Sequence, residues 1–177
     1  MKKIIPMALA LSVLAGCANY RWTSQAPSDM RTVTVPTFRN ESEIVELGAV
    51  ATRQLLREFQ REGTFRIAHA GDAAVEVQGV VKSASVDGRY FKREASMRNI
   101  GQRFVVSAEI SVVDRRSGKV VIDNRRYDAE TNVLLDNDVT TAMRDASGRA
   151  AEDLARQVVD DVAACRWDNL KDGEVSK

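Results

Sequence analysis

The sequence predicts an α+β fold, with two helices packed on one face of a sheet of about four antiparallel or mixed strands. Two patterns carry this prediction. Four segments alternate apolar and polar residues, as half-buried strands do, and two longer segments repeat apolar residues every three or four positions, as amphipathic helices do. Their order is strand, helix, three strands, helix, which places both helices on one sheet face and leaves the other face uncovered.

The first predicted strand is followed by the first helix. Residues 32–38 alternate β-branched side chains, and Pro36 favours a sheet edge or a bulge because proline cannot donate a ladder hydrogen bond. The helix follows candidate caps at residues 40–42 and ends at Gly63. Its apolar stripe consists of Ile44, Leu47, Ala51, Leu55 and Phe59. A short extended piece is predicted at residues 65–67.

Three more strands complete the predicted sheet. Residues 75–82 form a half-buried strand in which Gly79 is the candidate for a bulge. Residues 103–112 and 119–127 form a β-hairpin, with Gly118 supplying the positive φ of its turn. The uncovered face should then be mixed in polarity and able to pack against a partner. Its expected residues are Thr32, Thr34, Glu76, Gln78, Val80, Lys82, Arg103, Val105, Ser107 and Glu109.

The second predicted helix is long and lies near the end of the chain. Asp136, Asn137 and Asp138 offer caps at its start. Its stripe consists of Val139, Met143, Ala146, Ala150, Leu154, Val158, Val162 and Cys165. Cys165 is therefore expected to act as a small buried hydrophobe, with an intermolecular disulfide or a reactive thiol as the alternative.

The amino terminus has the form of a bacterial lipoprotein signal. Two lysines precede an apolar run of about a dozen residues, which is shorter than the roughly 20 needed to cross a bilayer, so we expect it to be cleaved. The run ends in Leu-Ala-Gly-Cys17, which resembles the lipobox in which the cysteine thiol receives diacylglycerol. Ala18 replaces the aspartate that would retain a lipoprotein in the inner membrane, which favours the outer membrane.

These features divide the chain into four parts. We predict a signal peptide at residues 1–16, a lipidated linker at 17–31, one domain at 32–168 and a polar tail at 169–177. Removal of the signal takes the 26 Lys and Arg residues to 24, against 25 Asp and Glu residues. A nearly neutral chain does not fit a protein that coats nucleic acid.

Residues for catalysis or for a metal or other cofactor are scarce. His69 is the single histidine, so one subunit cannot form a Ser-His-Asp triad or a histidine metal cluster. The paired carboxylates Asp136/Asp138 and Asp160/Asp161 are better explained by helix capping and by solvation. No glycine spacing matches a phosphate-binding loop. We therefore expect no enzyme activity, no metal and no cofactor.

The most unusual stretch joins the second and third strands and is basic. Arg89, Lys92, Arg93 and Arg98 lie among aromatic and thioether side chains. Such a set suits a phosphorylated amphiphile, because guanidinium and ammonium groups bind phosphate while apolar groups contact acyl chains. The alternatives are a solvated flexible loop and, less consistent with a membrane-tethered protein, a site for single-stranded nucleic acid.

Short motifs along the mature chain resemble the LptE-like family of lipopolysaccharide-assembly lipoproteins. They are Leu-Ala-Gly-Cys17 with Tyr20, Val33-Thr-Val-Pro-Thr-Phe-Arg-Asn40, Leu56-Arg-Glu-Phe59, Gly63-Thr-Phe65, Asp72-Ala-Ala-Val75 through Gly79, and the turn from Asp114 to Lys119. Two departures are Ala18, where the family usually has glycine, with Asn19 before Tyr20, and Cys165, which matches no family role.

The resemblance implies a non-enzymatic α+β lipoprotein that plugs the outer-membrane β-barrel LptD, helps it assemble and binds lipopolysaccharide. The domain would lie on the periplasmic side or within the barrel lumen. The candidate lipopolysaccharide contacts Arg89, Lys92, Arg93 and Arg98 rest on this sequence alone. Two rival readings stay open: an accessory lipoprotein of another envelope assembly or secretion machine, and an envelope hydrolase whose chemistry is assembled between chains.

Overall fold

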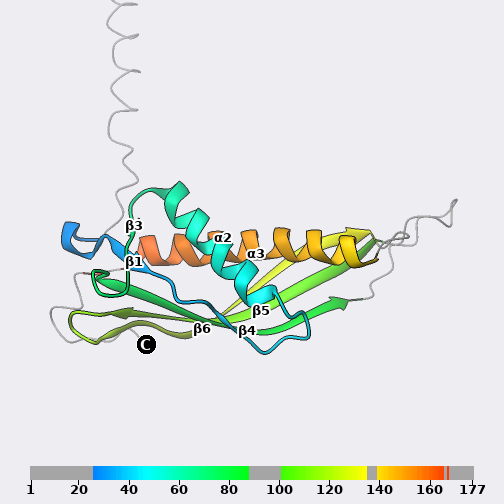
Figure 1. Cartoon of the computed structure of the whole chain (residues 1–177), viewed down its shortest axis with the longest axis horizontal. Coiled ribbons are helices and arrows are strands. Elements are labelled where there is room, and N and C mark those ends of the chain that lie inside the picture. The colour runs from blue at the N-terminus through cyan, green and yellow to red at the C-terminus, as the bar shows by residue number, and fades with distance from the viewer. Residues whose placement is uncertain (1–25, 88–100, 135–138, 166, 168–177) are drawn as a thin grey trace, which may run out of the picture.

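The protein is a two-layer α+β structure. The computed structural model describes residues 26–87, 101–134, 139–165 and 167. Two helices lie over one face of a single mixed sheet and pack against each other as well as against the strands (Figure 1). The predicted fold class, with both helices on one face, is confirmed.

The sheet has six strands rather than about four. In chain order the elements are η2 (Ser28–Met30), β1 (Thr32–Thr34), β2 (Arg39–Asn40), α2 (Leu47–Glu62), β3 (Arg66–Ile67), β4 (Val75–Asp87), β5 (Gly101–Asp114), β6 (Val120–Leu134) and α3 (Val139–Ala164). The strand order is β3-β1-β4-β5-β6, and β2 also pairs with β4. The short strands β1, β2 and β3 are parallel to their neighbours, whereas β4, β5 and β6 form an antiparallel meander.

The predicted first strand, residues 32–38, is shorter than expected, and a second short strand follows it. Pairing stops after Thr34, at the segment that contains Pro36, and resumes with β4 at Arg39. Phe38 follows Pro36 and is buried against Gly79, where an added Cβ would lie 2.4 Å from the Phe38 ring. Gly79 is therefore not the predicted bulge but a space for an aromatic ring, and the irregularity in β4 comes later, after Val81.

Helix α2 begins later than the predicted caps suggested. It starts at Leu47, and the residue before it makes no side-chain capping hydrogen bond. Asn40 instead holds the bend that leads into the helix, because its amide donates to the carbonyl oxygens of Ile44 at 2.8 Å and Val45 at 3.0 Å. The helix ends as predicted at Gly63, which has a φ of 82° and donates its N–H to the carbonyl oxygen of Phe59.

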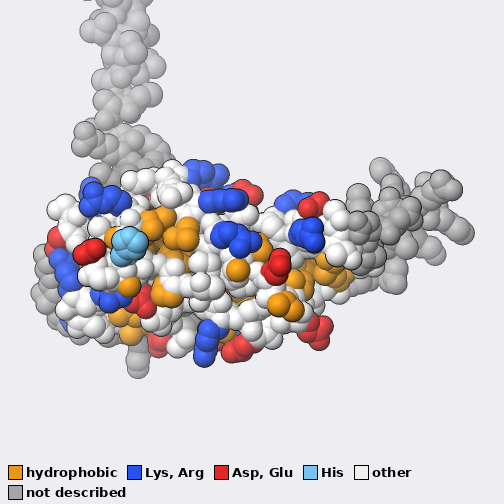
Figure 2. All heavy atoms as spheres, viewed as in Figure 1, with side chains coloured by type: hydrophobic (Ala, Val, Ile, Leu, Met, Phe, Trp, Pro, Cys, Tyr) orange, Lys and Arg blue, Asp and Glu red, His pale blue; other side chains and the backbone are white. Residues whose placement is uncertain are grey.

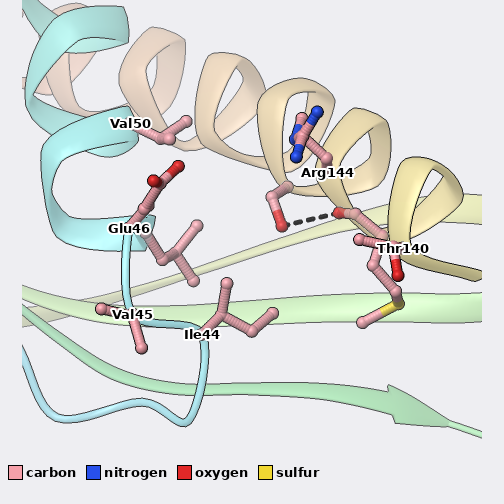
Figure 3. A pocket seen from close by; sticks show the side chains of 9 residues that line it. Ile44, Val45, Glu46, Val50, Thr140 and Arg144 are labelled. Carbon is pink, nitrogen blue, oxygen red and sulfur yellow. Dashed lines mark hydrogen bonds between the residues drawn. The ribbon is translucent and has the colours of Figure 1, made fainter.

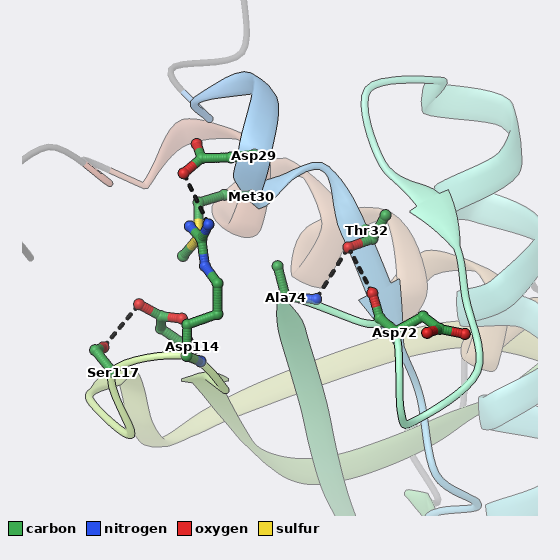
Figure 4. A network of polar contacts seen from close by, with 8 residues as sticks. Asp29, Met30, Thr32, Asp72, Ala74, Asp114 and Ser117 are labelled. Carbon is green, nitrogen blue, oxygen red and sulfur yellow. Dashed lines mark hydrogen bonds and ion pairs between the residues drawn. The ribbon is translucent and has the colours of Figure 1, made fainter.

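The β5–β6 turn ties the beginning of the packed chain to the sheet (Figure 4). Gly118 has the predicted positive φ, 72°. The Asp114 carboxylate accepts hydrogen bonds from the backbone N–H of Arg116 at 2.9 Å and from the Ser117 hydroxyl at 2.7 Å. The Arg116 side chain in turn forms an ion pair of 2.8 Å with Asp29 and contacts the sulfur of Met30, which is buried in the core.

Strand β6 is one of the two edges of the sheet, and helix α3 partly covers it. Gln157 donates from Nε2 to the backbone carbonyl oxygen of Asp128 at 3.2 Å. Arg149 donates from Nη2 to the carbonyl oxygen of Asn132 at 3.1 Å. Side chains of the helix therefore take up two acceptors that a further strand would otherwise use.

Candidate functional site

The site residues predicted from the sequence lie outside the described part of the chain. They are Cys17, Arg89, Lys92, Arg93 and Arg98. The basic segment is joined to the described residues at Asp87 and Gly101, and Gly101 pairs with Leu134 at the end of β6. Helix α3 starts at this same end of the sheet (Figure 1). The basic segment therefore leaves and re-enters the domain next to the start of α3.

The charged side chains of the uncovered sheet face form ion pairs and hydrogen bonds with one another. Lys82 forms an ion pair of 2.6 Å with Glu41, and Arg103 forms one of 2.9 Å with Glu130. Ser107 donates a hydrogen bond to Asp128, which together with nearby Arg126 keeps the pKa of the Asp128 carboxyl below its ordinary value. Two residues that were expected on the exposed part of this face, Thr34 and Ser107, are buried.

The other candidates for chemistry do not come together. His69 is exposed, and within the described ranges no group of three His, Cys, Asp or Glu side chains could hold a metal ion. Asp136 and Asp138 lie outside these ranges. Asp160 is exposed, as predicted, but Asp161 is half-buried because it binds two side chains of β6.

Asp161 is the centre of a small polar cluster between α3 and β6. Its Oδ2 accepts hydrogen bonds from Arg125 at 2.8 Å and from the Tyr127 hydroxyl at 2.9 Å. Burial and the Asp161 carboxylate raise the pKa of Tyr127 well above its ordinary value. Cys165 lies nearby, half-buried against the core, and burial raises the pKa of its thiol, which favours the protonated form.

The helix-bearing face has a groove where α2 and α3 begin (Figure 3). The groove has a volume of about 440 Å³. Its apolar lining consists of Ile44, Val45, Leu47, Val50 and Met143. Leu47 is completely buried and forms a fixed floor, whereas the Val45 side chain is 88% exposed at the rim. Large hydrophobic side chains that are this exposed are exceptional on the described surface.

Polar and charged side chains complete the rim of this groove. Arg144 and Thr140 project from the first turns of α3, and Glu46 lies opposite, at the start of α2 (Figure 3). Among the described residues Arg144 has no ion-pair partner, and its distance to Glu46 exceeds that of a salt bridge. Figure 2 shows further Lys and Arg side chains gathered over the helices on this face. The groove is therefore apolar inside, with a free cation at its edge.

The groove could not be predicted from the sequence. Residues 44–50 and 140–147 are nearly a hundred positions apart, and no local pattern brings them together. One signal was present, because Val45 is a large apolar residue that falls outside the predicted stripe of its helix.

The described residues include no helix with the length and apolar character required to span a membrane. The family model for LptE, lipopolysaccharide-assembly, matches residues 30–162. No curated protein matches this chain.

Several solved structures resemble the domain. A protein from Xanthomonas campestris has a TM-score of 0.57 at 11% identity, over 86% of this chain and 93% of that one. A hypothetical protein from Chlamydia trachomatis has a TM-score of 0.53 at 15% identity, over 78% of this chain and 98% of that one. A minor lipoprotein from Acinetobacter baumannii has a TM-score of 0.46 at 14% identity, over 76% of this chain and 94% of that one. The first two share the fold.

Proposed function

The chain belongs to the LptE family of lipopolysaccharide-assembly proteins, and from this premise we propose that it is an outer-membrane lipoprotein of the lipopolysaccharide translocon. In this role it plugs the LptD β-barrel, helps the barrel to assemble and binds lipopolysaccharide without making or breaking a covalent bond. The observation that carries the proposal is the extent of the family match, residues 30–162, which includes all six strands, the whole of α2 and all but the last two residues of α3.

The paired charges of the uncovered sheet face support the role of a plug. The lumen of a large outer-membrane barrel is polar, so a domain inside it must present a polar surface. The outward side chains of β4, β5 and β6 satisfy this requirement, because pairs such as Lys82–Glu41 and Arg103–Glu130 already neutralise one another. Such a face can contact a polar wall without burying an uncompensated charge.

Lipidation of Cys17 would hold the domain near the membrane. Ala26 and Met30 are buried in the core, so the packed chain begins no later than Ala26. The nine residue steps from Cys17 to Ala26 span at most about 32 Å when fully extended. A Cys17→Ser variant is expected to appear in the soluble fraction and to lack the mass of the lipid, whereas the parent protein stays with the membrane.

The proposed partner can be tested by affinity purification of the mature lipoprotein from its own envelope after crosslinking in cells. Recovery of LptD in stoichiometric amount is the expected result. Recovery of a different barrel or a secretin without LptD would move the protein to another envelope machine, while the fold and the lipid anchor would stand.

We further propose that Arg89, Lys92, Arg93 and Arg98 bind the phosphates of lipopolysaccharide. Replacement of all four by glutamine should weaken binding of purified lipopolysaccharide at least tenfold, because charge-assisted hydrogen bonds to phosphate would be lost. A matched control removes four exposed arginines elsewhere on the domain. They are Arg39, Arg53, Arg57 and Arg66. Equal loss of binding in both variants would point to net charge and would remove the site assignment.

A further inference from the structure

The groove between the starts of α2 and α3 has the character of a lipid site. We propose that it holds one acyl chain of lipopolysaccharide, with Arg144 binding a phosphate of the same molecule. This inference rests on the proposed function and adds to it a location on the described surface, at residues that the basic segment does not include.

The size and lining of the groove support an acyl chain as its occupant. Its volume of about 440 Å³ lies within the range of roughly 300–1,000 Å³ that is usual for small-molecule sites. Leu47 gives it a floor that belongs to the packed core. Met143 forms part of its wall on α3, and an unbranched thioether side chain adapts readily to a flexible chain.

Val45 supplies a second argument. Its side chain is 88% exposed, although it lies on a bend that is held in place by hydrogen bonds from Asn40 to the carbonyl oxygens of Ile44 and Val45. The bend therefore presents an apolar side chain to water at the mouth of an apolar groove. An acyl chain in the groove would cover Val45 and remove this surface from water.

The charges at the rim fit an acyl chain that ends in a phosphorylated headgroup. Arg144 has no ion-pair partner in the described part of the chain, so its guanidinium is available to a phosphate. Glu46 lies on the opposite rim and would repel a phosphate there. The headgroup is thus directed to the α3 side, which is also the end of the domain where Asp87 and Gly101 join the basic segment.

Two exposed valines allow a matched test in the intact lipoprotein. Val45 is at the groove, and Val120, which is 43% exposed, lies outside its lining. With the photoreactive benzoylphenylalanine in place of Val45, irradiated cells should yield an adduct with lipopolysaccharide, and with the same group in place of Val120 they should not. In purified protein, Val45→Asp should weaken lipopolysaccharide binding by about tenfold, whereas Val120→Asp should leave it unchanged.

The proposed contact between Arg144 and a phosphate can be tested by comparing lipopolysaccharide with and without its phosphates. Arg144→Gln should weaken binding of lipopolysaccharide severalfold but should not change binding of the same glycolipid after enzymatic removal of its phosphates. Equal weakening for both ligands would overturn the role of Arg144. Val45 and Arg144 are both exposed, so neither Val45→Asp nor Arg144→Gln is expected to prevent folding.

The outcomes separate this inference from the proposed function. If the parent protein binds lipopolysaccharide but Val45→Asp binds it equally well and position 45 gives no glycolipid adduct, the groove is not the site and the proposed function stands. An adduct at position 45 with LptD or a second copy of this chain would also overturn the inference. If the parent protein does not bind lipopolysaccharide at all, the proposed ligand itself is wrong.

Discussion

The hydroxyl of Tyr127 donates a hydrogen bond of 2.9 Å to Oδ2 of Asp161 and thereby joins the edge strand β6 to α3, near the end of that helix. Arg125 binds the same oxygen at 2.8 Å, so two side chains of one strand share one carboxylate of the helix. Tyr127 is 5% exposed, whereas the side chain of Arg125 is 56% exposed. The buried member of this cluster therefore contributes more to stability than the exposed ion pair.

Removal of the buried hydroxyl should be measurable. Tyr127→Phe should lower the free energy of unfolding by about 1 kcal/mol, because one hydrogen bond is lost while the ring remains packed. Arg125→Gln should change it by at most about 0.5 kcal/mol, since exposed ion pairs contribute little. Urea denaturation of the two variants and the parent protein would test this, and a larger effect for Arg125→Gln would contradict it.

The same tyrosine predicts how stability depends on alkaline pH. Burial and the Asp161 carboxylate raise the pKa of Tyr127 above its ordinary value of 10.0, so the folded protein holds this proton more tightly than the unfolded chain. The corresponding stability is fully present below pH 10 and is lost as the pH rises toward the raised pKa. Denaturation between about pH 9 and pH 11.5 should therefore show a steeper decline for the parent than for Tyr127→Phe. Parallel curves would show that Tyr127 is not buried as described.

The close approach of Phe38 to Gly79 predicts a strong response to a single methyl group. Gly79→Ala places a Cβ 2.4 Å from the ring and should lower the free energy of unfolding by about 1–3 kcal/mol. Gly148→Ala is the control, because no atom lies within 4 Å of its added Cβ and alanine favours a helix by up to about 1 kcal/mol. Phe38→Leu should relieve part of the effect of Gly79→Ala, and simple additivity of the two substitutions would argue against contact.

The β5–β6 turn should depend on the Asp114 carboxylate. This side chain is almost fully buried and accepts from both the backbone N–H of Arg116 and the hydroxyl of Ser117. Asp114→Ala should therefore cost about 1–3 kcal/mol, because the backbone N–H of Arg116 and the Ser117 hydroxyl both lose their acceptor. Ser117→Ala removes only the hydroxyl at an exposed position and should cost less than about 1 kcal/mol. Thermal unfolding of both variants would show whether Asp114→Ala is the more destabilising of the two.

Local patterns were sufficient for the parts of the fold that depend on neighbours in sequence. The spacing of Leu47, Leu55 and Phe59 predicts the buried face of α2, and all three are 0% exposed. Gly118 predicts the turn of the hairpin, and its φ is 72°. The end of α2 at Gly63 was also predictable, since glycine adopts a left-handed conformation without strain.

Features that depend on distant contacts could not be predicted in this way. The role of Gly79 depends on Phe38, which is 41 positions earlier, and the parallel pairing of β1 with β4 has no local signal. Strand β4 continues to Asp87, beyond its predicted end, because β5 extends with it as a paired neighbour. The lipidation site and the basic segment stay predictions from sequence, and the groove arises from two helix starts that only the folded chain brings together.

The hydrogen bonds from Gln157 and Arg149 to the carbonyl oxygens of β6 have a consequence for the order of folding. The helix that covers this strand comes after it in the chain, so a newly made molecule exposes the full length of a 15-residue edge until this helix docks. During that interval the edge can pair with a strand of another molecule. The risk of such pairing therefore depends on how fast α3 docks, or on a carrier that shields β6 until it does.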